Sequence, residues 1–188
     1  VTKSVSSLLV GVAMHHGALS SVDQRLLPFF ADLQPADDPH WQDMTLHHLL
    51  TMTMGLDWGD ADPHGTGPGF FQQVLQRPLA HDPGTHWAYQ SANVNLLAGV
   101  LKQATGHHAD QVLVEWLLQP LGIADHEWSF MANDGYRLMD GSLQLRPRDL
   151  VKLGLLLRDQ GRWQGKQVVS ADWIERSLTP HIQTDGPE

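Results

Sequence analysis

Apolar residues recur at helical spacing from the start of the chain. The apolar positions of this first segment are Val5, Leu8, Leu9, Val12 and Ala13. Intervals of three and four residues place them on one face, which predicts an amphipathic helix packed against a core. Gly17 predicts the end of this helix. The pattern is already established at Val1, so Lys3 is expected in the first turn.

The same spacing, together with caps and breakers, predicts seven further helices. They are a helix from Ser21 to Pro28, one from Thr45 to Gly55, a short one from Phe70 to Pro78, one through Leu96 that ends at Gly106, one from Ala109 to Pro120, one from Pro147 to Gly161, and one capped by Ser170.

Strands are predicted in two short regions only. Residues 126–145 mix small apolar pieces with glycine, and residues 162–169 favour a strand or hairpin. The segment 56–69 is rich in Gly, Pro and Asp, which is typical of a long loop that contacts substrate. The chain has no internal repeat and no shift in composition, so residues 1–188 are expected to belong to one domain. Many helices with few strands indicate the helical part of a mixed α/β protein.

Composition and charge exclude several classes of function. The 188 residues carry 12 Lys+Arg against 21 Asp+Glu, whereas a nucleic-acid-binding surface needs a basic face. The chain has no cysteine, so it forms no disulfide, thiol nucleophile or cysteine–zinc site. Its longest apolar run, residues 8–14, is far shorter than the roughly 20 residues of a membrane span. The composition fits a bacterial cytoplasm or periplasm equally.

Twelve histidines raise the question of a metal site. The pairs at 15–16, 47–48 and 107–108 are adjacent, so their side chains diverge by about 100° on a helix. No H-E-x-x-H motif is present. His81 and His86 flank a Pro-Gly turn and could converge. Surface histidines are the simpler interpretation, and we predict neither a metal nor an organic cofactor.

Lys3 and Tyr89 are the candidates for chemistry. A serine three positions before Lys3, directly before Val1, would lie on the same helix face with Cβ atoms about 5–6 Å apart. The lysine could then accept its proton. A tyrosine whose hydroxyl faces a lysine can act as general base and then acid. The simpler alternatives are a surface lysine and a turn tyrosine with its ring in the core.

Tryptophans offer further candidates. Trp58 lies in the long loop and Trp87 lies two residues before Tyr89, so both are candidates for lining a substrate cleft. Packing against a neighbouring loop is the alternative for each. Trp116 and Trp173 have helical spacing and are predicted to lie in the core.

Five segments, in this order, resemble the serine β-lactamase/penicillin-binding-protein superfamily: VTKS…LLVGVAMHHGALS, MTLHHLLTMTMGLDW, PGTHWAYQSANVNLLAGVLKQATG, WLLQPLGI and DGSLQLRPRDLVKLGLLLRDQGRW. The chain is most similar to the class C-like serine hydrolases, a branch with esterases, D-amino-acid-specific peptidases and 6-aminohexanoate-dimer hydrolases. The resemblance runs from Val1 to about Ser177. It implies an α+β fold of the β-lactamase (DD-peptidase) type, of which this chain holds the helical lobe without most of the flanking antiparallel strands.

The resemblance also implies site residues. Lys3 matches the lysine of S-x-x-K, and Tyr89 matches the tyrosine of the second motif, usually Y-x-N. Ser91 takes the third position of that motif, with Asn93 two residues further on, and either could orient the relay or contact substrate. Y-x-S is more similar to the esterase and 6-aminohexanoate-hydrolase branch than to class C β-lactamases, which favours esters or amides. Gly141 would match a backbone position near the site.

Two parts of the family pattern are missing from the chain: the nucleophilic serine and the strand motif that supplies an oxyanion-hole N–H. We expect the intact protein to hydrolyse a small ester, amide or β-lactam-like molecule through an acyl-enzyme, and the 188-residue chain alone to be inactive. The alternative is a non-catalytic binding or scaffold homologue. The residue before Val1 discriminates between them, because serine favours the enzyme.

Overall fold

A computed structural model describes residues 1–59, 69–129 and 135–184. Most of the predicted long loop, residues 60–68, lies outside the described residues. The helices are α1 (Thr2–His15), η1 (Leu27–Phe30), η2 (Pro39–Asp43), α2 (Leu46–Leu50), α3 (Phe70–Leu75), α4 (Ser91–Thr105), α5 (Ala109–Val112), η3 (Leu113–Leu118), α6 (Pro147–Arg158) and α7 (Ala171–Ser177). The strands are β1 (His126–Trp128), β2 (Leu143–Leu145), β3 (Arg162–Trp163) and β4 (Lys166–Gln167).

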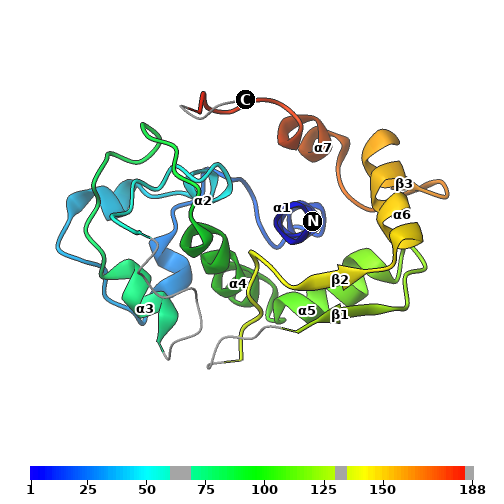
Figure 1. Ribbon diagram of the computed structural model, residues 1–188, viewed down its shortest axis with the longest axis horizontal. Coiled ribbons are helices and arrows are strands. Elements are labelled where there is room, and N and C mark those ends of the chain that lie inside the picture. Colours follow the sequence, from blue (N-terminus) through cyan, green and yellow to red (C-terminus); the bar gives the residue numbers. More distant parts are fainter. Residues whose placement is uncertain (60–68, 130–134, 185–188) are drawn as a thin grey trace.

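Helix α1 lies at the centre of the molecule (Figure 1). It contacts α4, α5 and η3, and α7 packs against it from another side. Val5, Leu9 and Val12 are at most 1% exposed, so the predicted apolar face of α1 is buried. Because several elements hold α1, the side chains of its first turns are fixed relative to α4.

Local signals locate several helix ends correctly. Ser170 caps α7, where its Oγ accepts from the backbone N–H of Trp173 (3.2 Å). Pro147 opens α6 in the first turn, where a missing N–H leaves no bond unmade. Gly106 ends α4 in the left-handed conformation.

The helix predicted from Ser21 to Pro28 is wrong. The Gln24 side chain accepts from the backbone N–H groups of Ser20 (2.7 Å) and Ser21 (3.1 Å), which closes a turn. Arg25 then forms a β-bridge with Thr45, so its backbone is extended. The short 3₁₀-helix η1 follows, with Pro28 in its first turn. A side-chain cap and a distant strand partner have overridden the local helical spacing.

The helix predicted from Ala109 to Pro120 consists of two parts. A short α-helical segment, α5, passes into the π-helical segment η3, after which the N–H of Gln119 donates to Val114 O (2.9 Å), five residues back. Of the two tryptophans predicted for the core, Trp173 is buried. Trp116 is half-buried and stacks on His16, with ring centroids 4.3 Å apart.

The predicted strands form two small antiparallel pairs. β1 pairs with β2, with His126 opposite Leu145 and Trp128 opposite Leu143, and β3 pairs with β4. Two isolated bridges, between Arg25 and Thr45 and between Leu56 and Leu79, add to these pairs. The chain is therefore the predicted helical lobe with few strands. No helix in the described ranges is long and apolar enough to cross a membrane.

Two neighbouring histidines of α2 have lowered pKa values. Burial is the main cause that lowers the pKa of His47, and the charges of His181 and Arg176 add to it. Burial also lowers the pKa of His48, followed by the charge of His47. Nδ1 of His48 accepts from the backbone N–H of Thr45 (3.2 Å) at the start of α2. Protonation of that nitrogen would remove this acceptor.

We expect the protein to lose stability as the pH falls below the ordinary histidine pKa of 6.5. Because both pKa values are lower in the folded state, the unfolded state binds more protons in that window and is favoured there. Urea denaturation from about pH 7.5 to about pH 5.5 measures the loss, and His48→Gln should reduce it. His40→Gln is the control with the opposite sign: the hydrogen bond to Asp38 raises the pKa of His40, so charging this histidine stabilises the folded state as the pH falls, and its removal should not reduce the loss. An undiminished loss in His48→Gln would contradict the assignment.

Candidate functional site

The segment that leads into β2 lies against the first two turns of α1. Lys3 Nζ donates to the backbone carbonyl of Asp140 (2.9 Å). One turn on, Ser6 Oγ donates to the carbonyl of Met139 (2.6 Å). Thr2 Oγ1 accepts from the N–H of Leu143 (3.2 Å). Three consecutive polar contacts therefore fix the start of α1 against residues 139–143.

The same segment is held from its other side. Asn95 of α4 accepts through Oδ1 from the backbone N–H of Asp140 (3.1 Å). Trp128 Nε1 donates to the carbonyls of Leu138 (3.0 Å) and Gly141 (3.1 Å). Asp140, whose carbonyl accepts from Lys3, is thus also held through its own N–H, which restricts where the ammonium group can lie. Gly141 contributes a backbone group here, as the resemblance implied.

Tyr89 lies next to Lys3. Lys3 Nζ is 5.0 Å from the centroid of the Tyr89 ring, a cation–π contact, and Tyr89 is 65% exposed. The described contact is with the ring face, whereas the sequence interpretation placed the hydroxyl towards the lysine. Gln90 anchors this corner, since its Nε2 donates to the carbonyls of Leu56 (3.1 Å) and Trp58 (3.1 Å).

Ser91 and Asn93 lie in the first turn of α4, whereas the sequence placed them just before the helix. Ser91 is half-buried. Asn93 is fully buried, and neither polar atom of its amide has a hydrogen-bond partner among the described residues. A substrate-orienting role for these two residues stays a prediction.

The two candidate cleft tryptophans differ in their surroundings. Trp87 is half-buried with its ring centroid 6.4 Å from that of Tyr89, so it belongs to the same corner. Trp58 packs edge-on against Phe70 (6.2 Å) and under the Arg77 guanidinium (5.2 Å), both on or next to α3. These contacts match the alternative of packing against a neighbouring segment.

His81 and His86 do converge, with ring centroids 4.1 Å apart. Within the ranges that the structure describes, no group of three or more His, Cys, Asp or Glu side chains could hold a metal ion. The pair alone supplies too few ligands for a structural or catalytic zinc site.

Sequence analysis missed Asn95 and Asp140 as parts of the site. A signal was present: Asn95 stands among apolar neighbours in a helix whose face is otherwise aliphatic, and it is 1% exposed. A buried amide needs a partner, so such a residue predicts a distant backbone contact. The identity of that partner, 45 residues away, could not be inferred from local pattern.

Comparison with known proteins places this geometry in context. A family model described as Beta-lactamase matches residues 1–183. The chain is 26% identical over 162 residues to the lovastatin esterase of Penicillium rubens, covering 77% of this chain and 40% of that protein. It is 31% identical over 102 residues to the 6-aminohexanoate-dimer hydrolase of Paenarthrobacter ureafaciens, covering 53% of this chain and 26% of that protein.

A solved structure shares the fold. The penicillin-binding protein homologue of Pyrococcus abyssi superposes with a TM-score of 0.73 at 20% identity, covering 98% of this chain and 48% of that chain. The chain thus spans less than half the length of each of these three proteins. The helical lobe predicted from the sequence is the corresponding part of a β-lactamase-like fold.

Proposed function

The chain belongs to the beta-lactamase family, and from that premise we propose that the protein containing it hydrolyses ester or amide bonds through an acyl-enzyme on serine. The observation that supports the proposal is the placement of Lys3 Nζ beside Tyr89 at the start of α1, with Asp140 O as its fixed acceptor. No metal or organic cofactor is part of the proposal.

The proposed nucleophile is a serine directly before Val1, three positions before Lys3. On the helix face of Lys3 its Oγ would lie within reach of the ammonium group. The N-terminal end of α1 also favours negative charge, because the helix dipole is positive there. Both effects favour the alkoxide that attacks a carbonyl carbon.

Tyr89 is proposed to complete the proton relay with Lys3. As serine Oγ bonds to the carbonyl carbon, its proton passes to the Lys3–Tyr89 pair and then to the departing alcohol or amine. Water then attacks the acyl carbon and gives a proton to the same pair, which returns it to serine Oγ as the ester bond to the serine breaks and the carboxylic acid leaves. Ser91 is proposed to orient the relay or contact the substrate, and Asn93 to support the same corner.

An ester or amide of a small molecule is the proposed substrate class, with Trp87 lining the acyl or alcohol side. The Y-x-S form of the second motif supports this choice, as do the names of the two relatives, a lovastatin esterase and a 6-aminohexanoate-dimer hydrolase. The competing proposal is a non-catalytic scaffold homologue.

Covalent labelling tests the proposal. The protein containing this chain is incubated with a fluorophosphonate, which reacts with activated serines, and the adduct is located by peptide mass spectrometry. We expect one adduct, on the residue before Val1, together with hydrolysis of p-nitrophenyl esters. A folded protein that forms no adduct there, or has another residue at that position, would establish the scaffold alternative.

Asn95 is expected to act as a positioning residue for Lys3. Asn95→Leu removes the acceptor for the N–H of Asp140, so the carbonyl that holds Lys3 is less constrained, and we expect kcat/KM for an ester to fall about tenfold. The loss of one buried hydrogen bond costs about 1 kcal/mol. Nδ2 of Asn95 has no partner in the described residues, so its removal offsets part of that cost.

The pH–rate profile separates positioning from general damage. If Asn95→Leu displaces Lys3, the limb of the kcat/KM profile that reports proton transfer by the relay should shift to a different pH. Asn95→Asp keeps Oδ1 as an acceptor and should restore part of the activity. A uniform fall in rate at every pH, with a matching loss of stability, would show that Asn95 is only structural.

A further inference from the structure

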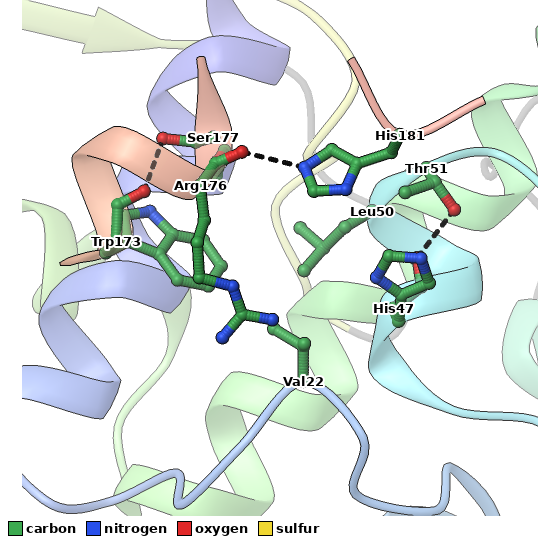
Figure 2. A pocket seen from close by; sticks show the side chains of 9 residues that line it. Val22, His47, Leu50, Thr51, Trp173, Arg176, Ser177 and His181 are labelled. Atoms are coloured by element: carbon green, nitrogen blue, oxygen red, sulfur yellow. Dashed lines mark hydrogen bonds between the residues drawn. The ribbon is translucent and has the colours of Figure 1, made fainter. Parts of the chain in front are cut away.

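A small cavity lies between α1, α2 and α7, and none of the predicted site residues lines it. Its volume is about 100 Å³. On this measure about 10–15 Å³ is enough for one water, so the space holds several water-sized groups. Figure 2 shows side chains from α2 and α7, with Val22, pointing into it.

One part of the wall is apolar. The Trp173 ring, Leu50 and Val22 face the cavity (Figure 2). Trp173 and Val22 are at most 5% exposed. This wall suits an aliphatic group and offers little to a fully hydrated inorganic ion.

Basic groups and three hydroxyl-bearing residues form the rest of the wall; the latter are Ser7, Thr51 and Ser177. The Arg176 guanidinium has no ion-pair partner among the described residues, nor do the ring nitrogens of His47 have a hydrogen-bond partner there. The His47 and His181 rings are 5.4 Å apart. His181 Nε2 lies 2.7 Å from the carbonyl of Arg176, so it must donate, and Nδ1 stays free. Three groups able to carry positive charge therefore meet without a bonded counter-charge.

We propose that this cavity binds a short-chain aliphatic carboxylate. Its carboxylate group would contact Arg176 and His47, while its alkyl chain would lie against Trp173, Leu50 and Val22. Arginine pairs with a carboxylate through two parallel hydrogen bonds, which matches the head group. The volume limits the ligand to about four carbons. This site is separate from the Lys3–Tyr89 corner and does not depend on the proposed hydrolysis.

Binding should strengthen as the pH falls. A bound carboxylate favours the charged form of His47, so the complex takes up a proton as His47 is charged. His181, Arg176 and His48 are the cationic neighbours of His47, and the Asp23 charge opposes them. The neighbouring cations and burial lower the pKa of His47 in the free protein, and a carboxylate would reverse part of that effect.

Titration with sodium butyrate, followed by NMR of ¹³C-labelled histidine side chains in the protein containing this chain, tests the proposal. We expect saturable shifts of the His47 and His181 signals, with tighter binding at about pH 6 than at about pH 8. Arg176→Gln should weaken binding about tenfold or more, since a hydrogen bond to a charged group contributes about 1.5–3 kcal/mol. Arg148→Gln, which removes an exposed arginine of α6 outside the cavity, should leave it unchanged.

Two further ligands test whether the cavity requires both the carboxylate and the alkyl chain. Butyramide has the same alkyl chain without the charge, and inorganic phosphate has charge without the chain, so both should bind at least about tenfold more weakly. Equal binding of butyramide would mean an apolar pocket that ignores Arg176. Equal binding of phosphate would mean a general oxyanion site. Either result overturns the proposal, as would the absence of a saturable shift or binding that is unaffected by Arg176→Gln.

Discussion

Replacing Lys3 by alanine in the protein that contains this chain is expected to lower kcat/KM for an ester substrate at least about 10²-fold. The Asp140 carbonyl and the Tyr89 ring hold Lys3 Nζ in place. The proposed serine before Val1 lies on the same helix face, so the held ammonium group can contact it. The loss of Lys3 removes one member of the proposed Lys3–Tyr89 proton relay, together with the ammonium charge that favours the serine alkoxide. Steady-state hydrolysis of a p-nitrophenyl ester measures the effect.

The chain contains a matched control for this substitution. Lys102 of α4 also donates from Nζ to a backbone carbonyl at 2.9 Å, that of Gly106, but it lies far along α4 from Tyr89. Lys102→Ala removes the same charge and the same kind of bond, and activity should stay within about twofold. Similar losses in both variants would mean that Lys3 has no special part in the reaction.

Tyr89→Phe separates the proton relay from packing. Phenylalanine keeps the ring beneath the Lys3 ammonium group and removes only the hydroxyl. If the hydroxyl transfers protons, activity should fall about as far as in Lys3→Ala, at least about 10²-fold. Unchanged turnover in Tyr89→Phe would refute the relay, while a loss in Lys3→Ala alone would assign proton transfer to the lysine.

Helices with strong local signals could be predicted from the sequence. The caps at Ser170 and Pro147 act within one turn, so neither needs information from the rest of the chain. The failure at Ser21 has the opposite origin. There the extended conformation of Arg25 depends on its β-bridge with Thr45. The side chain of Gln24 also accepts the hydrogen bonds of the Ser20 and Ser21 N–H groups, which closes a turn in place of a helix.

The candidate site shows the same division between local signals and contacts with distant residues. Lys3 and Tyr89 follow from motif chemistry, and the structure brings them together. The bond from Lys3 to Asp140 spans 137 positions, and the bond from Asn95 to the same residue spans 45. The spacing of apolar residues cannot predict such contacts, because they form only when β2 and the segment before it pack against α1 and α4. Trp58 shows the reverse case, since its place in a loop suggested a cleft while its ring packs on Phe70.

Replacing Gly55 by alanine should cause a large loss of stability for so small a change. Gly55 has φ +76°, a conformation that costs a residue with a Cβ about 1–2 kcal/mol. A Cβ there would also lie 2.1 Å from the backbone carbonyl oxygen of His81, so that backbone must move. The movement strains the bonds from the N–H groups of Ala80 (2.7 Å) and His81 (3.2 Å) to Gly55 O, each worth about 1 kcal/mol. We expect a total loss of about 3 kcal/mol in the free energy of unfolding.

Gly106→Ala is the matched control, because Gly106 has the same φ of +76° but no atom within 4 Å of an added Cβ. Urea denaturation should give a loss of about 1–2 kcal/mol for this control, and a clearly larger one for Gly55→Ala. The difference isolates the close approach of the His81 carbonyl from backbone conformation. Residues 80–88 lead from that carbonyl to Tyr89 and bond back to Thr53 and Met52. Gly55→Ala should therefore also lower esterase activity, whereas Gly106→Ala should not, and equal losses in both would show that the His81 contact imposes no constraint.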